Sequence, residues 1–215
     1  MNVVAIAGTG TDVGKTYVTA AVARVLRARG CNVVARKPAQ SFAPGDDTEQ
    51  RTDAHELARA TGQAPDDVCP PHRWLPTPLA PPMAADALGL PPFTIAELAA
   101  ESRHDLDAPA PALLLVETAG GVRSPIACDG DCVALITELA PALVVLVADA
   151  GLGTINAVRL SVDALRKQRV VVYLNRYDPT VDVHARNAQW LTTREGLVVL
   201  TDAEALADFL EPLAR

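Results

Sequence analysis

Short apolar runs alternate with amphipathic stretches along most of the 215-residue chain. Continuous runs of Val, Ile and Leu are typical of parallel strands that are covered on both faces. Their alternation with helical patterns indicates crossover helices. We therefore predict strands at 3–7, 32–36, 112–117, 142–148, 170–174 and 197–200. We predict helices at 15–29, 53–61, 94–104, 131–139, 154–167, 183–193 and 202–213.

One span does not follow this alternation. Residues 63–92 hold nine of the 17 prolines. Proline interrupts regular structure, so we predict an extended connection with at most a short helix near 83–88. Nothing there marks a domain boundary, and we expect a single domain over residues 1–215.

The first predicted strand leads into Gly-Thr-Gly-Thr-Asp-Val-Gly-Lys-Thr, residues 8–16. Such a turn directs backbone N–H groups at an anion, with Lys15 reaching the outer phosphates and the Thr16 hydroxyl placed for Mg²⁺. Thr9 stands where the strict pattern has glycine, so the loop is a variant, and an ordinary glycine-rich turn is the alternative. The prediction is an α/β fold of the P-loop NTPase type, with a doubly wound, mainly parallel sheet and helices on both faces.

Four further predicted strands end in polar or glycine-rich groups. These are 37–41, 117–121, 149–156 and Asn175. Ligands of doubly wound sheets bind beyond the carboxyl ends of the strands, so these groups are predicted to converge on one crevice.

The net charge of −7 and a pI near 5.0 argue against nucleic acid and anionic membranes as partners. No apolar run approaches the roughly 18 residues of a membrane span, so we expect a cytoplasmic protein. The cysteines and histidines are scattered, and packing or surface roles are favoured over redox or metal roles. The cysteines are Cys31, Cys69, Cys128 and Cys132.

Several motifs, in this order, resemble those of the dethiobiotin synthetase family. The resemblance runs from residue 3 to about 190. It rests on the loop 8–16, Lys37-Pro38 with Ser41, Thr52-Asp53-Ala54, the proline-rich 77–85, Glu117 with 119–121, 151–156, and Asn175.

The resemblance implies an ATP- and Mg²⁺-dependent homodimer. Such an enzyme adds CO₂ to 7,8-diaminononanoate and closes a cyclic urea through a carbamate and a carbamic-phosphoric anhydride. Asp53 and Glu117 would join Thr16 at the metal, and the start of the helix at Gly153, Thr154, Ile155 and Asn156 would hold the substrate carboxylate. The implied catalytic residues are Lys15, Lys37, Thr11, Asp12 and Ser41. The implied nucleotide-binding residues are Gly10, Thr11, Asp12, Val13, Gly14, Lys15, Thr16, Tyr17, Glu117, Gly120, Gly121 and Asn175.

Read without the resemblance, three of these residues have structural alternatives: Asp53 as a helix N-cap, Lys37 as a solvated lysine and Asn175 as a turn residue. The chain departs from the family pattern at Gly10, Asp12, Thr118 and Asn187. Two other hypotheses therefore stay open: the same architecture acting on another amine or acid, and a P-loop ATPase that works as a nucleotide switch.

Overall fold

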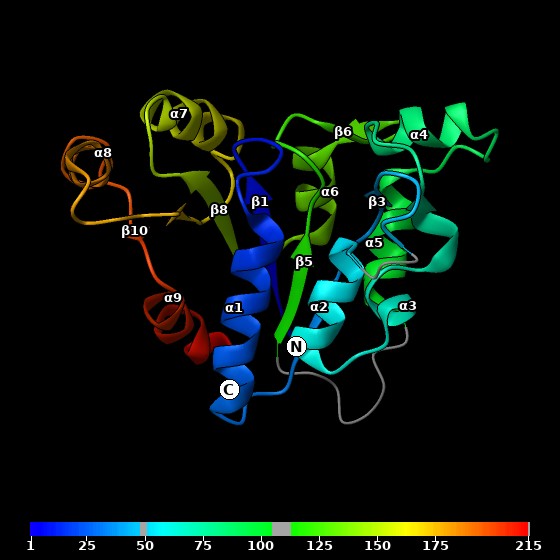
Figure 1. Cartoon of the computed structure of the whole chain (residues 1–215), viewed down its shortest axis with the longest axis horizontal. Helices are drawn as coiled ribbons and strands as arrows, with labels where there is room; N and C mark the ends of the chain where they lie inside the picture. The colour runs from blue at the N-terminus through cyan, green and yellow to red at the C-terminus, as the bar shows by residue number, and fades with distance from the viewer. Residues whose placement is uncertain (48–50, 105–112, 215) are drawn as a thin grey trace.

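Six parallel strands form the central sheet of the protein, whose computed structural model describes residues 1–47, 51–104 and 113–214. The strand order is β10-β9-β8-β1-β5-β2 (Figure 1). All six predicted strands are confirmed within two residues, although residue 112 of the predicted strand 112–117 lies outside the described residues. The strands are β1 (Asn2–Gly8), β2 (Val33–Arg36), β5 (Leu113–Glu117), β8 (Leu143–Asp149), β9 (Val170–Asn175) and β10 (Val199–Leu200).

Helices cover both faces of this sheet, as predicted. Successive strand residues point to opposite faces, so Val4 and Ile6 of β1 pack with one helical layer while Ala5 and Ala7 pack with the other. The first layer contains α1 (Lys15–Ala28), α2 (Asp53–Thr61) and α9 (Ala203–Leu210), which continues into η2 (Glu211–Leu213). The second contains α5 (Ile95–Arg103), α6 (Cys132–Leu139), α7 (Thr154–Ala164) and α8 (Asp182–Thr193).

The short helix predicted near 83–88 is confirmed by α4 (Pro81–Ala87), but the prediction that the rest of the proline-rich span is extended was wrong. Prolines open three helical segments, at the position where a helix needs no N–H donor from its own residue. Those segments are α3 (Pro65–Val68), η1 (Pro71–Arg73) and α4 (Pro81–Ala87). Between the last two, β4 (Trp74–Leu75) pairs in parallel with β3 (Gln40–Ser41).

A small antiparallel pair, β6 (Pro125–Ala127) with β7 (Gly130–Asp131), also escaped the sequence analysis. Both small sheets stand beyond the carboxyl ends of the central strands. They therefore add walls to the crevice predicted there.

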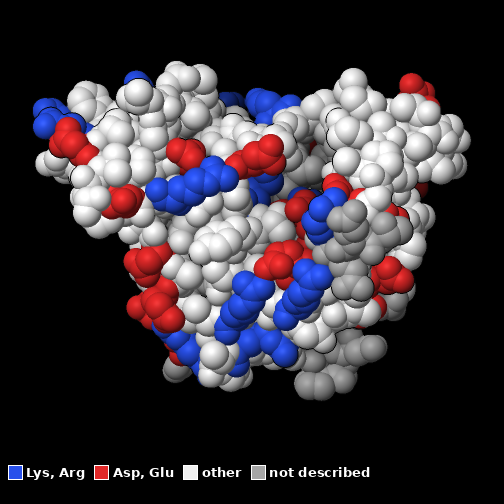
Figure 2. All heavy atoms as spheres, in the orientation of Figure 1, with Lys and Arg blue, Asp and Glu red and all other residues white. Residues whose placement is uncertain are grey.

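Acidic and basic side chains are interspersed on the face shown in Figure 2. No helix among the described residues is long and apolar enough to span a bilayer. All four cysteines are free, and burial raises the pKa of Cys132 to about 11, which keeps it a packed thiol. Across the described ranges, no three His, Cys, Asp or Glu side chains gather as a metal cluster.

Candidate functional site

The loop between β1 and α1 is shaped for an anion. Gly14 precedes α1 with φ +93°, and a Cβ on it would lie 2.0 Å from Asn175 Nδ2, so only glycine fits. In the described parts of the chain, the N–H groups of Val13, Gly14 and Lys15 donate to no protein acceptor. Free N–H groups at a helix start attract negative charge. The predicted phosphate cradle therefore has the required backbone.

Lys15 lies folded over this loop. Its side chain is buried, with 7% of the residue exposed, and Nζ donates to the Gly10 carbonyl at 3.0 Å. Burial and the nearby Lys37 ammonium lower the pKa of Lys15. A neutral carbonyl is a weak partner for an ammonium group, so a phosphate oxygen would be a better acceptor for this lysine.

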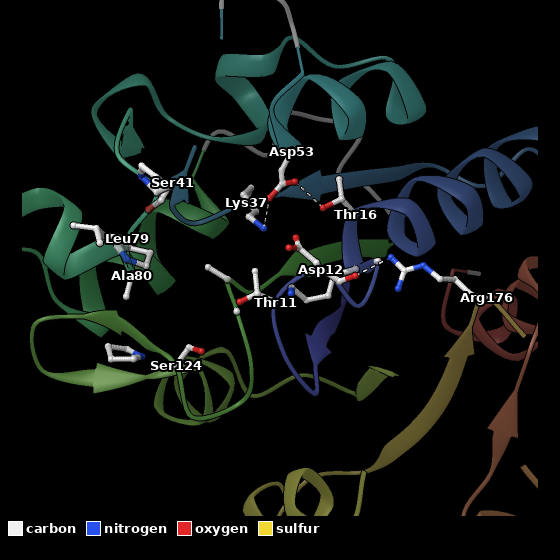
Figure 3. A pocket seen from close by; sticks show the side chains of 17 residues that line it. Thr11, Asp12, Thr16, Lys37, Ser41, Asp53, Leu79, Ala80, Ser124 and Arg176 are labelled. Carbon is white, nitrogen blue, oxygen red and sulfur yellow. Dashed lines mark hydrogen bonds and ion pairs between the residues drawn. The ribbon is translucent and has the colours of Figure 1, made fainter. Parts of the chain in front are cut away.

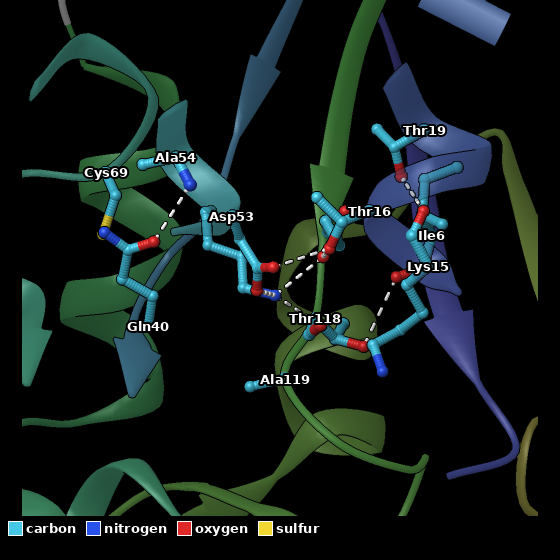
Figure 4. Close-up of polar contacts among 12 residues, drawn as sticks. Ile6, Lys15, Thr16, Thr19, Gln40, Asp53, Ala54, Cys69, Thr118 and Ala119 are labelled. Carbon is cyan, nitrogen blue, oxygen red and sulfur yellow. Dashed lines mark hydrogen bonds and ion pairs between the residues drawn. The ribbon is translucent and has the colours of Figure 1, made fainter. Parts of the chain in front are cut away.

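Two helices and the ends of two strands bring four side chains together in what we call the carboxylate–lysine cluster: Thr16 of α1, Asp53 of α2, Lys37 after β2 and Glu117 of β5. Thr16 and Asp53 are labelled in Figures 3 and 4. Lys37 Nζ lies 2.7 Å from both Asp53 Oδ2 and Glu117 Oε1. The Thr16 hydroxyl lies 2.8 Å from both carboxylates. The four residues are spread over positions 16 to 117 of the sequence. They meet because β1, β5 and β2 are neighbours in the sheet.

Opposite charges hold this cluster together despite burial. Burial alone would lower the pKa of Lys37, but Asp53 and Glu117 raise it above its usual value. Burial would likewise raise the pKa of Asp53, and Lys37 and Thr16 hold it below its usual value. The ionised forms of Lys37 and Asp53 thus stabilise each other.

The cluster has capacity for one more cation. Glu117 is fully buried, and its Oε2 has no hydrogen-bond partner among the described residues. The Thr16 hydroxyl has a single hydrogen and so can donate to only one of its two carboxylates. A hydroxyl and two carboxylates are all oxygen donors, which suit Mg²⁺. The predicted metal residues therefore fit that ion.

A cavity of about 850 Å³ opens beside the cluster (Figure 3). Ser41 Oγ is buried at its wall and has no partner in the described chain. The predicted residues that line this cavity are Thr11, Asp12, Gly14, Lys15, Thr16, Lys37, Ser41, Asp53 and Gly120. The structure thus brings together all five predicted catalytic residues.

A second cavity, of about 560 Å³, lies on the other side of Gly14. Tyr17 and Asn175 line it, as do residues 201–203, which lead from β10 into the first residue of α9. The Asn175 Nδ2 donates to the Val13 carbonyl at 3.0 Å, which leaves its Oδ1 as an acceptor for a ligand. The cavity has the size and wall chemistry for a nucleobase.

The turn before α7 lies outside both cavities. Gly153 has φ +88°, and the buried Thr154 Oγ1 has no partner in the described chain. Asn187 donates to the Ala150 and Gly151 carbonyls at 2.9 and 2.8 Å and so fixes the turn from α8. Residues 153–156 follow this turn, and none of them lines either cavity.

Thr118 is one of the positions at which the chain was predicted to depart from the family pattern. Its side chain is fully buried, and its hydroxyl donates to the Ile6 carbonyl at 3.3 Å. The extra side chain thus bonds to β1 and stays out of the cavity wall.

Sequence reasoning missed several wall residues. Arg176 lines both cavities, and its position directly after a strand was the available signal. Other wall residues lie in or beside elements whose neighbours depend on tertiary structure: Ser124, Pro125, Tyr173, Tyr177, Thr201, Asp202 and Ala203. Pro78, Leu79, Ala80 and Pro81 belong to the motif 77–85 that carries part of the resemblance, but they were not predicted as site residues.

The fold and the loop define a nucleotide-binding protein of the P-loop class, and the AAA-domain family profile matches residues 2–200. The signal recognition particle receptor FtsY of Elizabethkingia anophelis shares the fold, with a TM-score of 0.57 at 12% identity. That match covers all of this chain and 65% of the receptor chain.

Sequence relatives are more specific. The ATP-dependent dethiobiotin synthetase BioD of Corynebacterium efficiens is 43% identical over 80% of this chain and 73% of its own. The enzyme of the same name from Haloferax mediterranei is 37% identical over 92% of this chain and 82% of its own. The chain belongs to the dethiobiotin synthetase family, which confirms the resemblance seen in its motifs.

Proposed function

We propose that this protein is an ATP-dependent dethiobiotin synthetase that joins CO₂ to 7,8-diaminononanoate and closes a cyclic urea. Membership of the family supports the reaction. The observation that carries the proposal is the gathering of Lys15, Lys37, Asp53 and Glu117 beneath the phosphate loop. A phosphoryl transfer between two anions needs this combination of cations and metal-binding carboxylates.

The reaction has three steps. One substrate amine attacks CO₂ and loses a proton, which gives a carbamate. A carbamate oxygen attacks the γ-phosphorus of ATP, ADP leaves, and a carbamic-phosphoric anhydride forms. The second amine then attacks the anhydride carbonyl, the bond to the phosphate oxygen breaks, and phosphate leaves as the ring closes. Because this amine is bound beside its target, proximity supplies much of the rate.

Lys15 and Lys37 offset the repulsion between the carbamate and the triphosphate in this scheme. Lys37 points two of its hydrogens at carboxylates, and its third contact is a long one of 3.4 Å to the Thr118 carbonyl. It must therefore exchange a present acceptor for a phosphate or carbamate oxygen during turnover. Thr11, Asp12 and Ser41 are assigned to the diamine and carbamate, and the unpartnered Ser41 hydroxyl supports this.

Thr16, Asp53 and Glu117 would hold Mg²⁺, as their oxygen donors and the unpartnered Glu117 Oε2 support. When bound, Mg²⁺ offsets negative charge on the phosphates. The nucleotide would lie along residues 10–17, with Gly120, Gly121 and Glu117 beside the phosphates. Its adenine would occupy the second cavity, where Asn175 Oδ1 can accept from the exocyclic amine.

We further propose a homodimer in which residues 153–156 hold the carboxylate of a substrate bound mainly by the partner subunit. Two apolar side chains beside that turn support a covered surface: Leu152 is 91% exposed and Leu160 is 64% exposed. Light scattering of the purified protein tests the oligomeric state, and a monomer at all concentrations would reject this part.

The remaining proposals concern the whole chain. One sheet connects elements from residue 2 to residue 200, which supports a single domain over residues 1–215. We also propose a cytoplasmic location, where ATP and CO₂ are available.

Incubation with 7,8-diaminononanoate, bicarbonate, Mg²⁺ and ATP tests the function directly. We expect equal amounts of ADP and dethiobiotin, both absent when the diamine is omitted. If neither ADP nor dethiobiotin forms, the proposal is rejected. Tight nucleotide binding with turnover of another diamine in a substrate panel would favour the alternative enzyme of the same architecture.

A further inference from the structure

Two consecutive residues at the end of β9 hold two consecutive carbonyls of the phosphate loop. Asn175 Nδ2 donates to the Val13 carbonyl at 3.0 Å. Arg176 Nη2 donates to the Asp12 carbonyl at 2.8 Å (Figure 3). Both loop carbonyls therefore face β9. Because a peptide carbonyl and the following N–H point in opposite directions, the N–H groups of these peptide units face the other way.

These contacts also act on the donors of the loop. The Asp12 carbonyl shares a peptide unit with the Val13 N–H, and the Val13 carbonyl shares one with the Gly14 N–H. A hydrogen bond to a carbonyl polarises its peptide unit and strengthens the N–H as a donor. The effect is largest when the donor is charged, as Arg176 is. The two N–H groups in question have no protein acceptor in the described chain.

Arg176 is itself held in place. Its Nη1 donates to Asp149 Oδ2 at 2.9 Å, and the other carboxylate oxygen of Asp149 accepts from the Gly151 N–H at 2.8 Å. Asp149 and Asn175 are paired residues at the ends of β8 and β9, so the sheet sets this spacing.

The backbone at both ends of the Arg176 contact is unusual. Asp12 has φ +58° and Arg176 has φ +56°, a region that residues other than glycine seldom occupy. Such conformations persist where surrounding contacts impose them, and they cluster at ligand sites. Here the two strained residues are joined by one hydrogen bond.

We propose that Arg176, braced by Asp149, is a positioning residue for the nucleotide. It holds the Asp12 carbonyl turned toward β9, so that the Val13 and Gly14 N–H groups are aimed at the triphosphate and polarised. The inference rests on the proposed function, because the loop must bind a nucleotide for this contact to matter.

The test compares nucleotide binding with chemistry in the full-length protein. The variants are Arg176→Ala, Arg176→Lys, Asp149→Asn and the double variant Arg176→Ala/Asp149→Asn. Asparagine at 149 keeps an oxygen for the Gly151 N–H but presents no charge to Arg176. Arg186→Ala is the matched control, because Arg186 forms an exposed ion pair with Asp182 on α8. Calorimetry with Mg²⁺ and AMPPNP gives Kd, and steady-state assays give kcat and both KM values.

We expect Arg176→Ala to raise the Kd for AMPPNP and the KM for ATP about tenfold, the loss typical of a hydrogen bond from a charged donor. Asp149→Asn should have a similar but smaller effect. The double variant should be no weaker than Arg176→Ala, because both residues act through one contact. Arg176→Lys should recover part of the affinity. We expect kcat, the KM for the diamine, and the control to change less than about twofold.

Two results would overturn the inference in distinguishable ways. If the unaltered protein does not bind AMPPNP, the proposed function fails and the inference fails with it. If the unaltered protein and Arg176→Ala bind AMPPNP with the same Kd, the proposed function stands but the positioning role of Arg176 is rejected. Arg176 then only forms a surface ion pair with Asp149, even if the thermal stability of the variant falls.

Discussion

The helices α1 and α7 begin in the same way but in different surroundings. Each follows a strand of the central sheet, and β1 and β8 are neighbours. Each is preceded by a glycine in the left-handed region, with φ +93° at Gly14 and +88° at Gly153. A Cβ at Gly14 would collide with Asn175, whereas nothing lies within 4 Å of one at Gly153.

The difference bears on the two anion sites that we propose, one for the triphosphate at α1 and one for the substrate carboxylate at α7. The α1 start is enclosed by two buried lysines, two carboxylates and the Asn175 and Arg176 contacts, which suits a multiply charged phosphate group. The α7 start has Asn187 and Asp149 behind it and the exposed Leu152 in front. Helix geometry supplies anion affinity at both, and the neighbours decide charge and enclosure.

The largest effect on turnover is expected from Lys37→Met, which changes the enclosed site at the start of α1. Losing this cation should lower turnover about 10²- to 10³-fold, as loss of an electrostatic donor does. It also leaves two carboxylates without their partner, so the free energy of unfolding without Mg²⁺ should fall by about 3–5 kcal/mol. ADP release and urea unfolding measure the two effects. Lys167→Met, at an exposed lysine, is the control. Unchanged turnover would remove Lys37 from the mechanism.

Alanine at the two helix-start glycines compares the sites directly. Gly14→Ala should weaken AMPPNP binding at least about 100-fold, because the new methyl group displaces Asn175 and the loop. Gly153→Ala should leave AMPPNP binding unchanged and cost only the left-handed backbone penalty of about 1–2 kcal/mol. Calorimetry and urea unfolding measure these quantities. Equal losses of nucleotide affinity would mean that enclosure is not what separates the sites.

Asn187→Ala should weaken substrate binding at the start of α7 and leave the start of α1 unchanged. It removes both hydrogen bonds to the turn before α7, so the KM for the diamine should rise about tenfold while the KM for ATP stays constant. Gln189→Ala, two residues further along α8 and exposed, serves as the control. An equal rise in both KM values would mean that Asn187 supports the stability of the whole protein and has no specific role at the substrate carboxylate.

The smallest effect concerns pH. The Gly151 N–H and Arg176 hold the pKa of Asp149 below its usual value near 3.9. Stability from a lowered carboxyl pKa is complete above the unfolded value and is lost as pH falls through the folded one. Asp149 is half exposed, so the loss should be below about 1 kcal/mol. Carboxyl NMR titration should show its midpoint rising in Arg176→Ala. An unchanged midpoint would show that Arg176 does not stabilise the carboxylate.

The sequence was most informative where a local pattern decides the outcome. The strands around 3–7 and 142–148 are apolar runs without competing signals, and the loop 8–16 carries its own glycine and lysine. The proline-rich span was misjudged because proline breaks a helix interior but favours a helix start, and composition does not separate these positions.

Contacts between residues far apart in the sequence could not be predicted from local patterns. Glu117 was assigned to the metal from the family, but its bond to Lys37 spans 80 residues and depends on β2 lying beside β5. Arg176 contacts a loop more than 160 residues earlier through a left-handed turn that arginine seldom adopts. Its position directly after a strand signals the cavity, but nothing in its neighbouring residues signals this contact or the left-handed backbone.

The walls of the second cavity, where we propose that adenine binds, come from opposite ends of the chain: Gly14 and Tyr17 stand on one side and residues 201–203 on another. A ribosome therefore releases the phosphate loop early and completes the cavity only after β10 has emerged. A nascent chain should consequently reach its full affinity for ATP in one late step, when the edge strand β10 pairs with β9.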